Sequence, residues 1–225
     1  MNSATEKPLR RMLINIIKGL GLHHLIRDIS LEWEMAQKKR RELREWKGKG
    51  CPTPPPDAIK RSHIRTTAKE YQLKILIETG TFYGGTMFAM RKQFCELHSI
   101  ELFEDLHTYV AQQFAHHPHL HFHQGDSAHL LPKLLQQIDQ PCLFWLDGHY
   151  MGEGTGLGDK ETPVLEEIRA IAASKISNHV ILVDDARLFD GTHDYPTRSE
   201  FEFFIQEHFP KSSLSLKDDI FFIKP

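Results

Sequence analysis

From residue 73 onward, short apolar runs alternate with segments of helical periodicity, and this alternation constrains the fold more than any other feature. The predicted strands are 73–77, 97–101, 120–124, 142–147 and 180–184. The predicted helices between them are 86–94, 104–115, 128–138 and 163–173. Strands that are joined through helices form a mostly parallel sheet with helices on both faces. We therefore predict an α/β fold with a doubly wound sheet.

The C-terminal residues are predicted to close this sheet. Thr197, followed three residues later by Glu200, is typical of a capping box for a helix that runs through His208. Two apolar runs, 214–217 and 220–223, then flank the pair Asp218-Asp219. A two-residue turn of this type between apolar runs predicts a β-hairpin.

Residues 1–56 are predicted to form a basic helical arm with a proline linker, ahead of one domain over 57–225. Residues 1–69 carry 16 Lys and Arg against 7 Asp and Glu, while the whole chain has 28 against 30. The excess of positive charge is therefore confined to the N-terminal part of the chain. Charge runs are usually solvated helix faces. We therefore favour contact of the arm with the domain, or with a second copy in a homo-oligomer, over a membrane surface or RNA.

The amino-acid composition and net charge restrict the location and the partners that we expect for the protein. The three cysteines are odd in number and contain no CxxC pair, which argues against a disulfide framework and indicates a reducing, cytoplasmic location. No apolar run reaches 18 residues, so we predict no transmembrane segment. The nearly balanced net charge of −2 argues against nucleic acid as the general partner.

The ends of the first three predicted strands carry the residues of a cofactor site. Ligands of open α/β sheets bind beyond the carboxyl ends of the strands. The first strand leads into Glu78-Thr-Gly80-Thr81-Phe-Tyr-Gly84, a glycine-containing turn before a helix. A dinucleotide fingerprint would need glycine where Phe82 stands, so NAD is disfavoured. The second strand ends at Glu101, whose carboxylate suits ribose hydroxyls, and the third at Gly125-Asp126-Ser127.

Four features occur in order: the Glu-x-Gly-x-x-x-Gly turn, the acidic end of the second strand, Gly-Asp after the third strand, and the C-terminal hairpin. Together they resemble class I S-adenosylmethionine-dependent methyltransferases. The Glu-Thr-Gly-Thr-x-x-Gly-Gly-Thr form resembles the branch of macrocin O-methyltransferase-like and cephalosporin hydroxylase-like proteins. The resemblance covers roughly residues 70–225. It implies a Rossmann-like methyltransferase fold with Glu78 and Gly80 at the methionine part, Glu101 at the ribose and Asp126 at the adenine. The full predicted cofactor set is Glu78, Gly80, Thr81, Gly84, Glu101, Asp126, Ser127 and Asp147. The alternative is that Glu101 and Asp126 cap the helices that follow them.

Aspartates follow the fourth and fifth predicted strands. Asp147 ends the fourth, and Asp184 and Asp185 end the fifth. On adjacent parallel strands these carboxylates would converge, and such a set suits Mg²⁺. In the metal-dependent O-methyltransferases that the chain resembles, these positions bind a divalent cation that orients the acceptor hydroxyl. The alternative is that the Asp184-Asp185 pair caps a loop and Asp147 contacts only the cofactor.

His149 is the predicted catalytic base, acting beside Asp147. The resembling sugar methyltransferases carry an acidic residue at this position, and an imidazole titrates near neutral pH. The glycine-rich residues 151–161 that follow are predicted to form a mobile lid. The alternative roles for His149 are a hydrogen bond to substrate or an ordinary loop position.

Five further histidines cluster at His116, His117, His119, His121 and His123. Along the third predicted strand, His119, His121 and His123 alternate with Leu120 and Phe122, which places these histidines on the face opposite the apolar pair. We favour an exposed or helix-covered face over a metal site.

The sequence thus predicts a Mg²⁺-dependent O-methyltransferase acting on a hydroxyl of a sugar or other small molecule. Two alternatives stay open: an RNA methyltransferase that uses the basic arm, and a scaffold protein that binds the cofactor without catalysis. The end of the fourth strand, Asp147-Gly148-His149-Tyr150, differs from the Asn/Asp-Pro-Pro-aromatic pattern of enzymes that methylate amino groups of bases.

Overall fold

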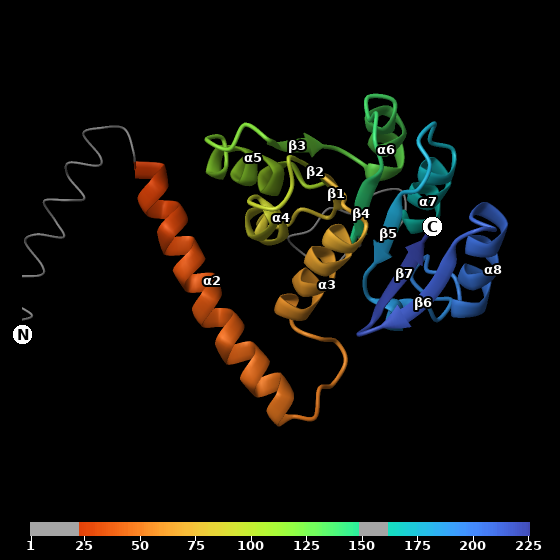
Figure 1. The fold of residues 1–225 in the computed structure, drawn as a ribbon, viewed down its shortest axis with the longest axis horizontal. Helices are drawn as coiled ribbons and strands as arrows, with labels where there is room; N and C mark the ends of the chain where they lie inside the picture. Colours follow the sequence, from red (N-terminus) through yellow and green to blue (C-terminus); the bar gives the residue numbers. More distant parts are fainter. Residues whose placement is uncertain (1–22, 149–161) are drawn as a thin grey trace, which may run out of the picture. The chain divides into compact units, whose positions relative to one another are not determined.

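The computed structural model describes residues 23–148 and 162–225, which belong to two compact units. The first unit, Met1–Gly50, contributes helix α2 (His23–Gly48), and the second, Cys51–Pro225, holds the sheet (Figure 1). His149, the predicted base, and the predicted lid lie outside the described residues. Among the helices that the structure describes, none combines the length and apolar character needed to cross a membrane.

The sheet of the second unit runs in the order β3-β2-β1-β4-β5-β7-β6. Its parallel strands are β1 (Ile75–Thr79), β2 (Glu96–Glu101), β3 (Leu120–Gln124), β4 (Cys142–Leu146) and β5 (Val180–Val183). The hairpin of β6 (Ser213–Lys217) and β7 (Ile220–Lys224) joins through β7, which pairs antiparallel with β5. Strand order reverses between β1 and β4, the position where open α/β sheets bind ligands.

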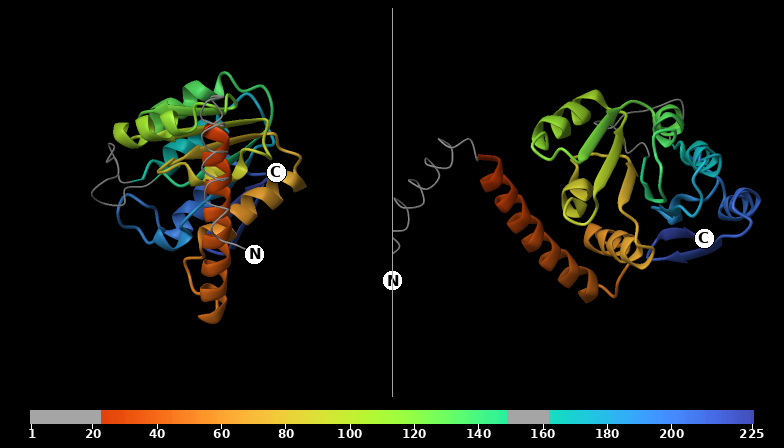
Figure 2. Two further views of the ribbon diagram at one scale, coloured as in Figure 1. Left: turned by 90° about the vertical axis from the view of Figure 1, so that its left-hand side faces the viewer. Right: turned by 45° about the horizontal axis from the view of Figure 1, so that its top comes forward.

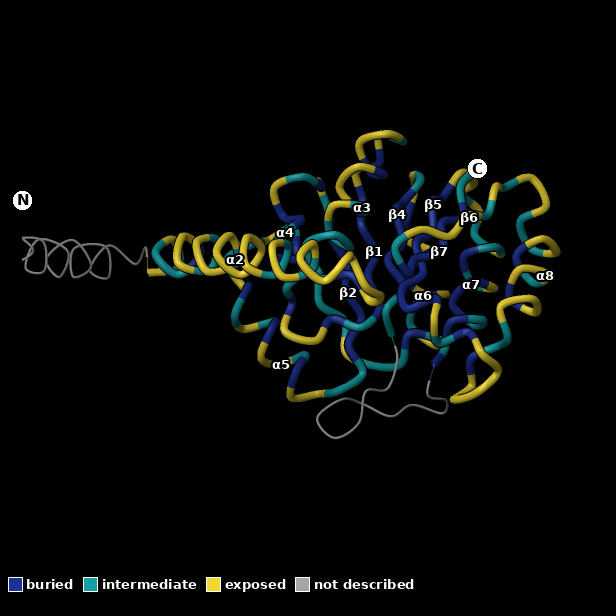
Figure 3. The backbone as a smooth tube through the Cα atoms, turned by 90° about the horizontal axis from the view of Figure 1, so that it is seen from below, coloured by how far each residue is buried: buried dark blue, intermediate teal, exposed yellow. Residues whose placement is uncertain are grey.

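Helices cover both faces of this sheet. In Figure 2, α3 (Asp57–Glu70), α4 (Gly85–Met90) and α5 (Glu104–Gln113) lie on the opposite side from α6 (Ser127–Leu135), α7 (Val164–Ala172) and α8 (Arg198–His208). Leu131, Ile168 and Phe201, one from each helix of the second group, are fully buried in one apolar cluster with residues of the strands. Figure 3 shows the central strands as the buried part of the chain.

The predicted fold class is confirmed, including the closing hairpin and the capping box. The Thr197 N–H donates to Glu200 Oε2 at 2.8 Å, and the Thr197 hydroxyl accepts from the Glu200 N–H at 3.3 Å. Asp218 and Asp219 have φ values of 49° and 63°, as a tight hairpin turn of type I′ requires. β1 begins two residues later than predicted because the Leu73 N–H bonds to Ala68 O and so belongs to the end of α3.

Helix α3 was not among the predicted elements. The prolines that precede it were interpreted as a linker, and residues 57–70 contain no long apolar run. The helix is nevertheless signalled by Asp57 in its first turn and by the spacing of Ile64, Thr67 and Ala68, which are its buried residues. This helix contributes a side chain to the site described next.

Candidate functional site

Backbone hydrogen bonds align the carboxyl ends of the central strands. The Asp147 N–H, just after β4, donates to Thr79 O of β1 at 3.1 Å. The Asp184 N–H, just after β5, donates to Leu146 O of β4 at 3.0 Å. The predicted site residues of three strands therefore share one edge of the sheet.

Gly80 occupies a position that only glycine accepts without strain. Its φ is +83°, and a Cβ at this position would lie 2.8 Å from the carbonyl carbon of Asp147 and closer still to the carbonyl oxygen. Gly84 has φ +70° and is the N-cap of α4. The glycine turn thus allows the backbone at the end of β1 to contact the backbone at the end of β4.

Glu78 is buried beneath this turn. Ser99 of β2 donates a hydrogen bond of 2.7 Å to its carboxylate, and the Ser99 hydroxyl lies 2.6 Å from that of Thr81. Burial raises the pKa of Glu78 to about 8, despite the hydrogen bond from Ser99. The carboxyl group is therefore mostly protonated at pH 7, and a cationic ligand beside it would favour its ionised form.

Glu101 is held by the backbone on both sides. The N–H groups of Phe82 and Phe103 donate to its two carboxylate oxygens at 2.8 and 2.9 Å. Each oxygen retains a lone pair, so the fixed carboxylate has two acceptors for a diol. Phe103, not Glu101, is the N-cap residue of α5, so a capping role does not account for Glu101.

Asp126 and Ser127, by contrast, already have partners within the protein. Asp126 is the N-cap of α6 and accepts the Ala128 N–H at 2.8 Å, as the capping alternative predicted. Ser127 donates to Glu167 of α7 at 2.6 Å. Burial raises the pKa of Glu167 to about 7. The second carboxylate oxygen of Asp126 lies 3.8 Å from Nδ1 of the exposed His129.

Asp147, Asp184 and Asp185, hereafter the acidic trio, come together as predicted. One carboxylate oxygen from each lies within 4.8 Å of the others. Burial, then the charge of Asp184, raises the pKa of Asp147 well above its ordinary range, and burial raises the pKa of Asp184 to about 6. Three crowded carboxylates in a desolvated site need cations for stability.

Lys60 of α3 supplies one of these cations. Its ammonium group bonds to Asp184 Oδ2 and lies 3.2 Å from Asp185 Oδ1, and its side chain is 17% exposed. Burial alone would lower the pKa of Lys60, but the charges of Asp184 and Asp185 raise it above its ordinary value. The residue is 124 positions from Asp184 in sequence, so no local pattern could have paired them.

Arg187 and the hairpin turn complete the surroundings of the trio. The Arg187 guanidinium donates to Asp185 at 2.6 Å and also to Asp219 in the turn between β6 and β7. His63 of α3 lies 2.7 Å from the carboxylate of Asp218 in the same turn. The turn therefore contacts both α3, which carries Lys60, and the segment after β5 that carries Arg187.

The donor sets can be tested against the predicted ligands. Glu78 and Glu101 offer carboxylates to the amino group and the ribose hydroxyls of S-adenosylmethionine, and this set fits. The acidic trio has the hard oxygen donors that Mg²⁺ prefers. Because the Lys60 ammonium bonds to two of the three carboxylates, Mg²⁺ fits this set only when Lys60 withdraws.

Comparison with known proteins identifies the fold. No family model and no curated protein matches the chain. Among solved structures, an O-methyltransferase from Bacillus cereus in complex with SAH is similar over 84% of this chain and 91% of its own, with a TM-score of 0.56 and 12% identity. The O-methyltransferase TomG from Streptomyces achromogenes, in complex with SAM, is similar over 82% and 87%, with a TM-score of 0.51 and 16% identity. The second unit has the fold of class I methyltransferases.

Proposed function

We propose that the protein is an S-adenosylmethionine-dependent O-methyltransferase. The observation that carries this proposal is the Glu101 carboxylate, which two backbone N–H groups hold at the end of β2, so that each oxygen keeps a lone pair for a ribose hydroxyl. In this fold that strand end adjoins the point where strand order reverses, so a nucleoside lying there would meet Glu101 with its ribose.

The other predicted cofactor residues are assigned roles on the same proposal. Glu78 and the turn of Gly80, Thr81 and Gly84 would receive the methionine part, whose cationic amino group favours an ionised Glu78. Asp126 would accept from the adenine amino group through its second oxygen, with Ser127 beside it. The backbone of Asp147 would border the reacting methyl group because it contacts the Gly80 turn.

The acceptor is proposed to be a hydroxyl of a sugar or similar small molecule, bound at the acidic trio. A small cavity at the ends of β4 and β5 is lined by Asp147, Asp184, Glu167 and Tyr195. Tyr195 also lines an open groove with Pro196 and Phe204, which offers an apolar surface beside the polar one. The cavity, of about 10 Å³, has room for about one water molecule, so the acceptor would lie in the groove with only its reacting hydroxyl toward the carboxylates.

The divalent cation predicted from the sequence belongs to this proposal. Asp147, Asp184 and Asp185 would hold Mg²⁺, and Lys60 would have to leave Asp184 and Asp185 first. When bound, such an ion supplies Lewis-acid chemistry that lowers the pKa of an acceptor hydroxyl. These three carboxylates would hold the ion at the ends of β4 and β5.

Binding of the cofactor tests the proposal directly. Calorimetry should show saturable binding of S-adenosylmethionine, and Glu101→Ala should weaken it about 10- to 100-fold because the lost hydrogen bonds to ribose are worth about 1–3 kcal/mol. Glu207→Ala, which removes an exposed carboxylate on α8, is the control and should bind normally. Absence of binding by the wild-type protein, or binding of NAD in its place, would contradict the proposal.

His149 is proposed as the base that accepts the proton of the acceptor hydroxyl. With labelled S-adenosylmethionine and a panel of sugars as acceptors, His149→Ala should lower turnover roughly tenfold or more and leave cofactor affinity unchanged. His193→Ala is the matched control. If the His149 variant keeps the turnover and the pH profile of the wild type, the residue only lines the site.

A further inference from the structure

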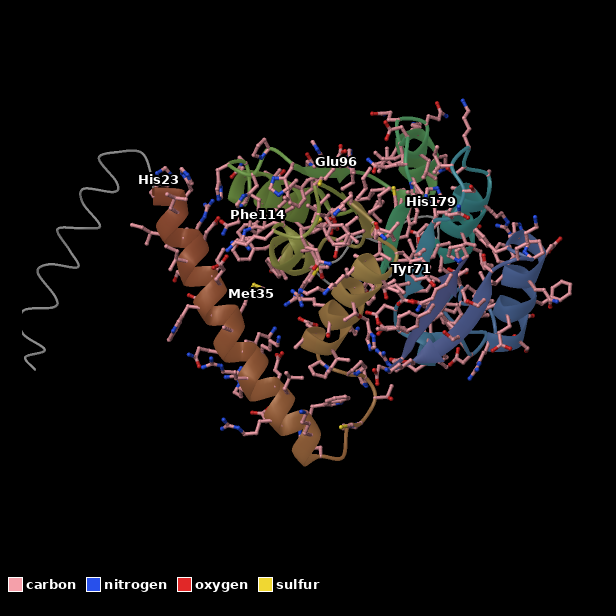
Figure 4. The ribbon with its side chains drawn as sticks, in the orientation of Figure 1. His23, Met35, Tyr71, Glu96, Phe114 and His179 are labelled. Carbon is pink, nitrogen blue, oxygen red and sulfur yellow. The ribbon has the colours of Figure 1, made fainter. Side chains whose placement is uncertain are left out.

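A second cluster of potential metal ligands lies at the other end of β2, away from the acidic trio. Glu96 is the first residue of β2, and Figure 4 labels it there. His98 pairs with His121 of β3 in the parallel register, and Glu96 lies two residues before His98, so the three side chains share one face. The same topology that builds the sheet therefore brings one carboxylate and two imidazoles together.

The distances within the cluster match those of a metal site. Glu96 Oε1 lies 3.1 Å from His98 Nε2 and 3.5 Å from His121 Nε2, and the three ligand atoms all lie within 4.8 Å of one another. Ligands at ~2.0–2.1 Å from a tetrahedral Zn²⁺ are separated from one another by ~3.3 Å. The rings of His98 and His121 are stacked, with centroids 4.8 Å apart and an interplanar angle of 23°, so the exposed His121 ring must turn about its side-chain bonds before both Nε2 atoms face one ion.

His98 has the surroundings of a metal-binding histidine. Its side chain is 8% exposed, and its buried Nε2 atom has no partner of hydrogen-bond geometry among the described residues. Its other nitrogen, Nδ1, lies 3.1 Å from His123 Nε2. In the tautomer that carries its proton on Nδ1 and donates it to His123, the lone pair of Nε2 would be available to a metal beside Glu96.

We propose that Glu96, His98 and His121 bind a Zn²⁺ ion or a similar borderline transition-metal ion, with water at the fourth position. Two imidazoles and a carboxylate favour Zn²⁺ over Mg²⁺, whose ligands are mainly oxygen. The ion would link β3, the edge strand of the sheet, to its neighbour β2. The sequence favoured an ordinary face here because the strand pattern did not reveal that His98 and Glu96 join the histidines of β3.

Titration of the full-length protein with Zn²⁺ after removal of metals by chelation tests this site. We expect one site whose affinity falls roughly tenfold or more in Glu96→Gln and in His121→Ala. Both side chains are partly exposed, so these variants should fold. Binding should persist in His129→Ala, an exposed histidine outside the cluster, and in Asp184→Asn, which disables the acidic trio.

Two further readouts make the outcome decisive. Co²⁺ in place of Zn²⁺ should give the absorption of a tetrahedral site in the wild type and lose it in His121→Ala. Zn²⁺ should raise the Tm of the wild type and not that of Glu96→Gln. The proposal is wrong if Glu96→Gln and His121→Ala bind Zn²⁺ as the wild type does, or if Asp184→Asn abolishes binding. Neither result bears on the proposed methyl transfer.

Discussion

Replacement of Lys60 by methionine is expected to strengthen the binding of a divalent cation to the acidic trio about 100-fold. The Lys60 ammonium bonds to Asp184 and Asp185, so in the wild type an incoming cation must first displace it. A pair of unit charges ~4 Å apart near a protein surface is worth about 4 kcal/mol, and part of this is recovered when Lys60 returns to water. A net 2.7 kcal/mol corresponds to the expected factor of ~100.

Binding of Mn²⁺, followed by electron paramagnetic resonance, measures this effect without reference to turnover. Without metal, Lys60→Met should also have a lower Tm because the trio keeps its carboxylates and loses a cation, and Mg²⁺ should restore the Tm. Lys69→Met, at an exposed position of the same helix, is the control. Equal affinity of wild type and Lys60→Met would show that Lys60 does not compete for the trio.

Turnover measured with and without a chelator, together with the binding of Mn²⁺, tests the proposed role of Mg²⁺. If the reaction uses the ion, an excess of chelator should stop turnover of the wild type and Mg²⁺ should restore it. If neither protein binds Mn²⁺, the proposed metal site is wrong, although methyl transfer could still proceed with the Lys60 ammonium at the trio. Binding of the cofactor, measured separately, distinguishes that outcome from failure of the methyltransferase proposal.

Gly80→Ala is expected to destabilise the protein by about 3–5 kcal/mol and to abolish binding of S-adenosylmethionine. The φ of +83° costs an alanine about 1–3 kcal/mol. The added Cβ would also collide with the backbone carbonyl of Asp147, a residue whose N–H donates to Thr79 O of β1. The strand ends would have to separate at the centre of the proposed cofactor site.

Thermal unfolding measures the first effect, where a drop in Tm of roughly 10 °C is expected for a chain of this size. Calorimetry measures the second. Gly48→Ala is the control, since a Cβ at Gly48 meets no atom within 4 Å. An unchanged Tm for Gly80→Ala would mean that the two strand ends do not approach each other as described.

The fold could be predicted because its signals are local. Strands such as β3 and β4 appear as short apolar or alternating runs, and the Thr197–Glu200 capping box lies within one turn of helix. The convergence of the acidic trio followed from one further assumption, that β4 and β5 are neighbours. Strand ends in a parallel sheet share an edge, so their residues could be assigned to one site.

The cations and the second cluster could not be predicted in this way. Lys60 reaches the trio from a helix that precedes the sheet, and its role depends on how α3 packs. The histidine cluster needed the register of β2 against β3, which pairs His98 with His121. Such pairings are tertiary, because the partners are far apart in sequence and no periodicity marks them.

The contacts of the Asp218–Asp219 turn couple the site to the local unfolding of the hairpin. This turn holds Arg187 through Asp219 and His63 through Asp218, so it supports one neighbour of the trio directly and the helix of Lys60 indirectly. β6 reaches the sheet only through β7, so both strands open together. An excursion that frees the hairpin would thus remove Asp219 from Arg187 and Asp218 from His63, while the parallel strands stay folded. Local opening of the hairpin would therefore loosen the surroundings of the trio before the parallel sheet unfolds.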